Sequence, residues 1–317
     1  MTESTIPPEC RLSTYDFELP RDLIAQQPAE YRDESRLMVL HRRSGDISHH
    51  KFKELPSLLL PSDLLVLNET KVIPVLLVGR KESGGRVELL VLDPAELPAR
   101  PTSETSTERV CLIRSSKPLR PGAQVHIDGG PAVESLETVS PGRSRIRFPV
   151  READLLGFLD TYGRPPLPPY IRADEANIER DRDRYQTVYA RIAGSVAAPT
   201  AGLHFTDDLL GALERQGTET ARILLHVGPA TFTPVRAEDI RFHRMESEFY
   251  EISEETGRQI REAHRARRRI IAVGTTCVRA LEAAATSTGT VRSGAGKTNL
   301  FLRPGHDTAS TATAMRV

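Results

Sequence analysis

Hydrophobic and polar positions alternate with a short period in the middle of the chain. Short apolar runs separated by glycine- and proline-rich turns are typical of antiparallel strands, and six such runs occur here: Val72 to Lys81, Arg86 to Asp93, Arg109 to Ser115, Gln124 to Ile127, Ala132 to Val139 and Ser144 to Val150. Strands of this kind favour a closed barrel or a sandwich. The residues 93–108 are rich in proline, serine and threonine and indicate a long loop without a site.

On both sides of this block, apolar positions follow helical spacing or form single buried strands. The helical periodicity predicts helices over residues 22–26, 151–161, 207–216, 254–268 and 276–285, and apolar runs predict strands at 36–41, 64–67, 221–227, 248–252 and 269–273. Strands and helices that alternate around a block of strands indicate an α/β core domain with an inserted antiparallel β-barrel domain. We assign residues 1–71 and 151–317 to the core and residues 72–150 to the barrel.

Composition and charge narrow the function classes. The chain has 43 Lys and Arg against 43 Asp and Glu, so any contact with nucleic acid depends on local patches. Cys10, Cys111 and Cys277 lack the spacing of metal ligands, and we expect no bound metal or cofactor. No apolar run reaches the roughly 20 residues that span a bilayer, and the N-terminus lacks a signal-peptide core. We therefore expect a cytoplasmic protein without membrane contact.

The densest candidate chemistry lies between Asp181 and Thr206. Residues 194–202 are almost all small, which lets the backbone approach a ligand closely. His204 follows at the start of the helix predicted at 207–216, for which Thr206 is the expected N-cap and Gly217 the expected stop. A tightly packed structural crossover with a buried histidine explains the same pattern, and this alternative stays open.

Polar residues also follow the predicted strands. Asn68 to Lys71 come directly after the strand at 64–67 and suit either a site or a turn capped by Asn and Thr side chains. Gly274 and Thr275 open the helix after the strand at 269–273, where free N–H groups suit a carboxylate or phosphate. Arg279, one turn further on, is a candidate counter-charge. A plain turn with threonine as the helix N-cap is the alternative.

Two further histidines belong to this set of candidates. His226 lies near the end of a predicted strand, and His243 lies close in sequence to Glu248, which suits either an acid–base pair or a surface ion pair. Sites of α/β domains assemble at strand ends. We expect one cleft to hold five dispersed residues: Asn68, His204, His226, His243 and Thr275.

Two other motifs carry less weight. Gly294 to Thr298 resembles the end of a phosphate-binding loop, but Val291 stands where that motif needs glycine, so we reject a nucleoside triphosphate site. The basic run from His264 to Arg269 suits either a helix end or a contact with nucleic-acid phosphates.

Several segments of the chain form a set of motifs. The most specific are Y-Q-T-V-Y-A, starting at Tyr185, and G-S-V-A-A-P-T-A-G-L-H-F-T, starting at Gly194. The others are L-I-A-Q-Q-P from Leu23, S-R-L from Ser35, N-E-T-K-V-I-P from Asn68, P-L-P-P-Y-I from Pro166, L-H-V-G from Leu225, T-F-T-P-V from Thr231, H-R-M-E-S-E from His243 and I-A-V-G-T-T-C-V-R from Ile271. Together they span most of the chain, and in content and order they resemble one family, the S-adenosylmethionine:tRNA ribosyltransferase-isomerases of queuosine biosynthesis.

The resemblance implies an enzyme with the two-domain design described above. It implies transfer and isomerisation of the ribosyl moiety of S-adenosylmethionine onto 7-aminomethyl-7-deazaguanine at the tRNA wobble position, giving epoxyqueuosine, adenine and methionine. S-adenosylmethionine is then a co-substrate and the modified tRNA a partner; we expect a monomer. The chemistry suits acid–base groups, with catalytic candidates His204, His226, His243 and Glu248. The expected substrate-binding residues are Asn68, Thr70, Tyr185, Thr200, Gly202, Gly274, Thr275 and Arg279.

The end of the chain departs from the family pattern. After Phe301 to His306 the family continues with a T-N-F-H-L-P-type segment and closing helices, whereas this sequence has D-T-A-S-T-A-T-A-M-R-V. We expect a chain that lacks the C-terminal segment to be less active and less stable than an extended one. A degenerate or truncated homologue that binds tRNA or S-adenosylmethionine without turnover is the alternative function.

Overall fold

The strand-rich middle of the chain forms a closed barrel in the computed structural model, which describes residues 6–92, 104–172, 177–305 and 313–315. Its antiparallel strands follow the order β10-β7-β6-β5-β8-β9. Their bounds are β5 Leu76–Lys81, β6 Arg86–Val91, β7 Thr107–Ser115, β8 Gln124–Ile127, β9 Ala132–Ser140 and β10 Arg143–Phe148. Alternate side chains such as Val87 and Leu89 fill the interior, as the period of a strand requires. The predicted fold class, an α/β core with an inserted barrel, is confirmed.

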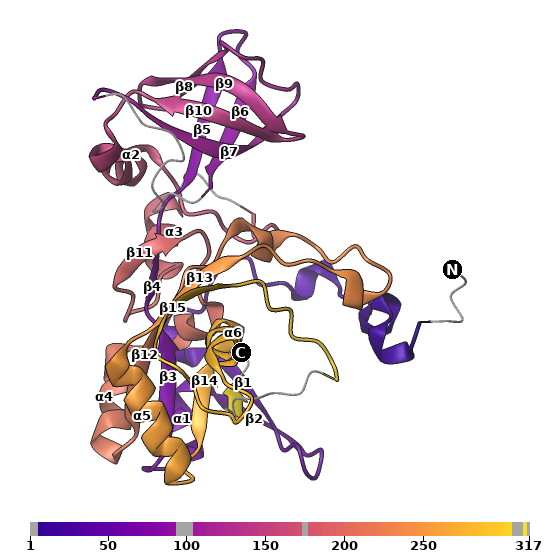
Figure 1. The fold of residues 1–317 in the computed structure, drawn as a ribbon, viewed down its shortest axis with the longest axis vertical. Coiled ribbons are helices and arrows are strands. Elements are labelled where there is room, and N and C mark those ends of the chain that lie inside the picture. Colours follow the sequence, from indigo (N-terminus) through magenta and orange to yellow (C-terminus); the bar gives the residue numbers. More distant parts are fainter. Residues whose placement is uncertain (1–5, 93–103, 173–176, 306–312, 316–317) are drawn as a thin grey trace.

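The predicted strand at 72–81 is two strands. β4 (Thr70–Val72) ends before Pro74, and β5 starts at Leu76, because proline has no N–H to donate to a strand ladder. β4 pairs in parallel with β11 (Ile192–Ser195), a strand that the small-residue pattern did not predict. Figure 1 shows this two-stranded sheet and α3 (Ile178–Arg184) between the barrel and the core sheet.

The core sheet has the strand order β15-β13-β12-β3-β14-β16. Its central strand is apolar and fully buried and pairs in parallel with both neighbours, whereas β13 and β15 run antiparallel at one edge. The edge strand β16 pairs in parallel with β14 and was not predicted. The bounds are β3 Leu64–Asn68, β12 Glu219–Leu225, β13 Glu248–Ile252, β14 Ile270–Val273, β15 Gly294–Thr298 and β16 Thr313–Met315.

Helices cover both faces of this sheet. On one face, α5 (Glu254–Arg265) and α6 (Gly274–Ala284) pack against Leu64 and Val66. On the other, α1 (Leu55–Leu58) and α4 (Asp207–Gln216) pack against Leu65 and Leu67. The alternation of the two faces along β3 follows from the strand period. α2 (Leu155–Tyr162) buries its apolar side chains with those of the barrel, although we assigned this segment to the core. The domain boundaries at 72 and 150 stay a prediction.

Several local predictions can be compared with the structure. The α4 bounds are confirmed: Thr206 Oγ1 accepts a hydrogen bond from Leu209 N at 3.1 Å, and Gly217 has a φ of 100°. The predicted helix at 22–26 is wrong, since only a 3-10 turn at Arg21–Leu23 forms. Most of the predicted loop at 93–108 lies outside the described residues, and Thr107 already belongs to β7.

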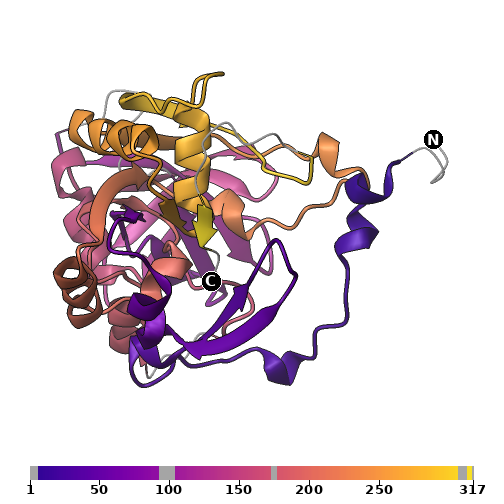
Figure 2. The ribbon, with the colours of Figure 1, turned by 90° about the horizontal axis from the view of Figure 1, so that it is seen from below.

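The N-terminal residues form an arm that leaves the body of the molecule. Figure 2 shows the arm curving away, with the segment that follows β12 reaching out to meet it. The two are joined by a bridge between Arg11 and Asp239. β1 (Arg36–Leu40) and β2 (Ile47–Lys51) then make a hairpin beside the core. In the described part of the chain, no helix is long and apolar enough to cross a bilayer.

Candidate active site at the strand ends of the core

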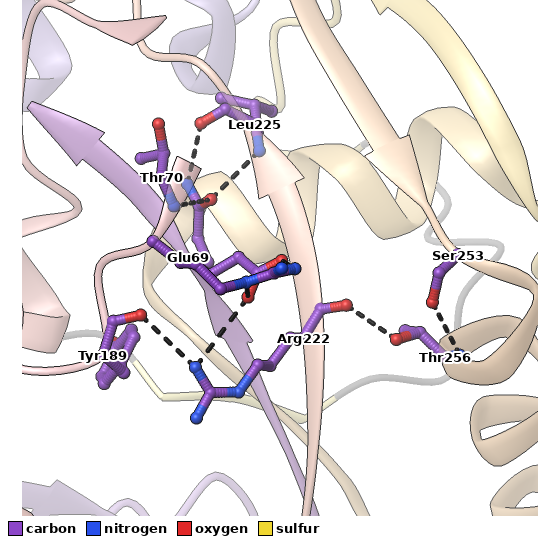
Figure 3. Close-up of polar contacts among 9 residues, drawn as sticks. Glu69, Thr70, Tyr189, Arg222, Leu225, Ser253 and Thr256 are labelled. Carbon is purple, nitrogen blue, oxygen red and sulfur yellow. Dashed lines mark hydrogen bonds and ion pairs between the residues drawn. The ribbon is translucent and has the colours of Figure 1, made fainter. Parts of the chain in front are cut away.

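Asn68 joins two parallel strands where β3 ends. Its side-chain amide donates to Leu225 O and accepts from Leu225 N, both at 3.0 Å, and also accepts from Thr70 N at 3.2 Å (Figure 3). The buried amide therefore takes the place of a backbone partner and holds the β3–β4 turn against β12. This geometry favours the capped-turn interpretation of Asn68, whose expected contact with substrate stays a prediction.

Glu69 fixes the same turn from its other side. This buried carboxylate accepts from Arg191 Nε at 2.9 Å and Nη2 at 2.6 Å, and Arg222 lies 3.9 Å away (Figure 3). A buried carboxylate is costly unless it is paired and hydrogen-bonded. The ion pair thus ties the turn after β3 to the segment that leads into β11.

His226 follows β12 and lies directly beside this turn. Its Nδ1 is 2.9 Å from Thr70 Oγ1, and its ring stacks on Phe249 with the centroids 5.9 Å apart. A Cβ added at Gly194 would lie 2.5 Å from Nε2, so only glycine leaves room for the ring there. Among the described residues, Nε2 has no hydrogen-bond partner. When Thr70 accepts from Nδ1–H, Nε2 is left as a free acceptor.

Burial keeps this imidazole neutral. It lowers the pKa of His226 because a low-dielectric environment disfavours the charged form. A neutral ring with an unpartnered nitrogen has the protonation state that a general base requires.

Glu248 and Arg279 form a buried ion pair at the start of β13. Glu248 Oε1 accepts from Gly228 N at 2.9 Å, and its other oxygen binds Arg279. The two side chains are 2% and 12% exposed. Burial raises the pKa of Glu248, against the opposing effects of the Arg279 charge and the Gly228 N–H. Arg279, which we expected to bind a ligand, thus binds the carboxylate of Glu248.

His243 lies apart from Glu248. Its ring packs edge-on against Phe301, with the centroids 4.8 Å apart. No hydrogen bond or ion pair links it to Glu248 in the described ranges, so the predicted pairing of these two residues is wrong. Closeness in sequence did not predict the partner, because Glu248 binds Arg279 of helix α6 instead.

The small-residue segment meets the start of α6. A Cβ added at Gly274, which has a φ of 81°, would lie 3.1 Å from Ala201 Cβ. Gly202 is more crowded: an added Cβ would overlap the Tyr189 hydroxyl and lie 2.8 Å from Thr187 Cγ2. The hydroxyls of Thr187 and Tyr189 are buried and have no hydrogen-bond partner in the described part of the chain. The small residues thus allow the chain to pack closely on itself, as the alternative of a structural crossover requires, and their expected approach to a ligand stays a prediction.

Thr275 and Thr200 remain exposed beside this contact. Thr275 lies in the first turn of α6, whose N-cap position is held by Val273 without a side-chain cap. The alternative of a threonine N-cap is therefore wrong. Thr200 starts the 3-10 turn Thr200–His204, which packs against α6. Both hydroxyls are accessible to a ligand at a helix N-terminus, where anions are favoured.

His204 belongs to a different cluster of contacts. Its ring lies 5.3 Å from the ring of Phe52, between centroids, on the α1 and α4 face of the sheet. Burial lowers the pKa of His204; a hydrogen bond with the backbone of Arg32 opposes this shift, and the charge of Arg32 adds to it. No contact joins it to His226 within the described residues. The expected meeting of the five dispersed residues in one cleft stays a prediction.

Tyr185 lines a pocket of about 350 Å³ between β4, the end of α2 and α3. It is buried, which raises the pKa of its hydroxyl. Two other lining residues, Lys71 and Arg182, were not among the predicted site residues. Two sequence features could have indicated them. Lys71 ends the motif N-E-T-K, and Arg182 lies in the charged run D-R-D-R, directly before Y-Q-T-V-Y-A.

The fold and these contacts define an α/β protein with an inserted barrel and polar groups gathered at the strand ends of its core. The model of the family described as queuosine biosynthesis protein matches residues 12–315, and the chain belongs to that family. An S-adenosylmethionine:tRNA ribosyltransferase-isomerase of Anaeromyxobacter dehalogenans (strain 2CP-C) is 46% identical over 297 residues, which cover 93% of this chain and 83% of the relative.

Two further proteins similar to this chain carry related names. The S-adenosylmethionine:tRNA ribosyltransferase-isomerase of Geotalea uraniireducens is 44% identical over 300 residues, with 93% of this chain and 83% of the relative covered. A crystal structure of S-adenosylmethionine tRNA ribosyltransferase from Thermotoga maritima is 32% identical and covers 93% of this chain and 80% of that chain, with a TM-score of 0.44. The family model and the two sequence relatives confirm the family predicted from the motifs.

Proposed function

We propose that the protein transfers and isomerises the ribosyl moiety of S-adenosylmethionine onto 7-aminomethyl-7-deazaguanine at the tRNA wobble position, giving epoxyqueuosine and releasing adenine and methionine. The observation that carries this proposal is the 46% identity, over 93% of the chain, to a relative named for this ribosyl transfer and isomerisation. We also propose that it acts as a cytoplasmic monomer and uses S-adenosylmethionine as co-substrate without a bound cofactor.

In this proposal His226 acts as the general base. The reaction needs a proton removed from the carbon beside the sulfonium, and the neutral imidazole offers an unpartnered Nε2 for it. Thr70 holds the ring by its other nitrogen, so that Nε2 keeps its lone pair. The exposed Thr200 and Thr275 are positioned for substrate contact at the start of α6. His204 and His243 stay candidates for the steps of adenine departure and amine attack.

The decisive experiment incubates the purified chain with labelled S-adenosylmethionine and tRNA that carries the deazaguanine precursor. We expect adenine release and a matching mass increase of the wobble nucleoside. The control is the same tRNA with guanine at that position, which lacks the aminomethyl nucleophile. Binding of tRNA or S-adenosylmethionine without adenine release would instead support the alternative, a degenerate homologue without turnover.

A further inference from the structure

The pocket between β4, α2 and α3 holds opposite charges that do not meet. The side chain of Lys71 has no hydrogen bond or ion pair in the described part of the chain. Arg182 donates only to Gly163 O, at 2.7 Å, and its Nε is buried without a partner. Neither cation has a carboxylate of the described residues within ion-pair distance, which is unusual for a partly buried arginine.

Carboxylates line the same pocket. Asp160 and Glu179 form no ion pair with any described residue, and Asp183 approaches only Arg32, at 3.9 Å. Free charges of opposite sign normally close on one another when side chains are long enough. Here the pocket volume of about 350 Å³ separates them.

The remaining walls are rigid and apolar. Pro74 and Pro165 line the pocket, as does the largely buried ring of Tyr185. The Gln186 amide accepts from Val72 N at 3.0 Å and donates to Val72 O at 3.2 Å, which fixes the end of α3 to β4. The volume lies near the lower end of small-molecule pockets.

From these contacts we infer that the pocket binds a zwitterionic α-amino acid group with an apolar side chain. Lys71 and Arg182 take the carboxylate, and the carboxylates of Asp160, Glu179 and Asp183 take the ammonium group. A phosphate dianion fits this lining poorly, because three carboxylates would repel it. The inference rests on the proposed function, in which the released product methionine has this chemistry.

Thr70 and Lys71 are neighbours on β4, with Thr70 buried and Lys71 exposed. Thr70 contacts His226, whereas Lys71 lines the pocket. The amino acid pocket and the histidine are thus built on consecutive residues of one strand.

The test measures binding of L-methionine to the full chain by calorimetry. We expect Lys71→Gln and Arg182→Gln each to weaken binding by about ten- to hundredfold, as the loss of a hydrogen bond to a charged group implies. Arg43→Gln, in the exposed turn between β1 and β2, is the matched control and leaves the affinity unchanged. Methioninol, which lacks the carboxylate, and 4-(methylthio)butanoate, which lacks the ammonium group, bind the wild type at least tenfold more weakly.

Unchanged L-methionine affinity in Lys71→Gln, a surface variant expected to fold, would overturn the inference. So would displacement of L-methionine by inorganic phosphate, which would point to a nucleic acid backbone contact. If Arg182→Gln fails to fold, Glu179→Gln on the exposed rim replaces it and reports on the ammonium side. Adenine release by the wild type is measured separately. Its absence would refute the proposed function, whereas the binding of L-methionine to the pocket is decided by calorimetry alone.

Discussion

The surface of the barrel and the junction between barrel and core differ in how their charged side chains are paired. On the barrel, charged residues of neighbouring strands pair with each other: Arg145 binds Glu137 at 2.7 Å, and Arg147 binds Glu134 at 2.9 Å. At the junction, Arg182 Nε and the hydroxyls of Thr187 and Tyr189 are buried without partners among the described residues. Buried polar atoms without partners are rare and often mark sites that a ligand completes.

This contrast indicates that the barrel has a structural role and that the junction holds the groups for chemistry. Where its surface charges pair across strands, the barrel gains stability from its own residues. The junction gives up some stability to keep groups free, as functional sites commonly do. We therefore expect substitutions at the junction to change activity and substitutions on the barrel to leave it unchanged.

The largest effect is expected at His226. His226→Ala should lower the rate of adenine release by about 10²- to 10⁴-fold, the usual contribution of a general base. The matched control is His126→Ala, an exposed histidine on β8 of the barrel, which should retain full activity. Single-turnover adenine release measures both variants. Equal rates for the two would remove His226 from the chemistry.

Next comes the buried ion pair of Arg279 and Glu248. Arg279→Met leaves the Glu248 carboxylate buried without its counter-charge, which should cost about 3 to 5 kcal/mol of unfolding free energy. The double variant Arg279→Met, Glu248→Met removes both charges and should recover part of that loss. Urea unfolding gives the values. A single variant within about 1 kcal/mol of wild type would show that the pair is not desolvated as described.

Much of the fold followed from the sequence because its signals are local. Strand alternation gave the barrel, and the N-cap Thr206 with Gly217 gave the bounds of α4. The pairing of Arg279 with Glu248, 31 residues apart, has no local signal. The pocket of Lys71 and Arg182 also depends on tertiary packing, and β11 was missed because its glycine and alanine residues have low strand propensity.

The candidate site was predictable in part for the same reason. His226 and Asn68 lie at strand ends, where α/β proteins gather polar groups, and the structure places them side by side. His204 also lies in a conspicuous motif, yet its ring packs on Phe52. A motif marks the backbone segment but does not fix the direction in which each side chain points.

A smaller loss of activity is expected when Gly194 is replaced. Gly194→Ala places a methyl group against the His226 ring and should displace it, lowering adenine release by about ten- to hundredfold. Gly157→Ala is the control, because nothing lies within 4 Å of the added Cβ on this helix of the barrel side. That variant should be as active as wild type and slightly more stable. An active Gly194→Ala would mean that the ring position is not critical.

The pH dependence sharpens the role of Thr70. Burial lowers the pKa of His226, so the neutral base persists on acidification and kcat/KM should fall only below an apparent pKa under 6.5. Thr70→Val removes the hydrogen-bond partner of the imidazolium, so it should move this limb to still lower pH and reduce kcat/KM about tenfold. Thr70→Ser keeps a hydroxyl and should restore both the position of the acidic limb and the wild-type kcat/KM. An unmoved limb would leave Thr70 with a packing role only.

The smallest effect is expected on the barrel, at Arg147. Its side chain is 43% exposed and has Glu134 at 2.9 Å and Glu108 at 3.4 Å as partners. Exposed ion pairs gain little because water and salt screen them, so Arg147→Gln should cost less than about 1 kcal/mol of unfolding free energy. That cost should shrink further in high salt, and adenine release should stay at the wild-type rate. A loss of activity in this variant at unchanged stability would show that the barrel surface takes part in binding tRNA, and the division between a structural barrel and a chemical junction would then have to be abandoned.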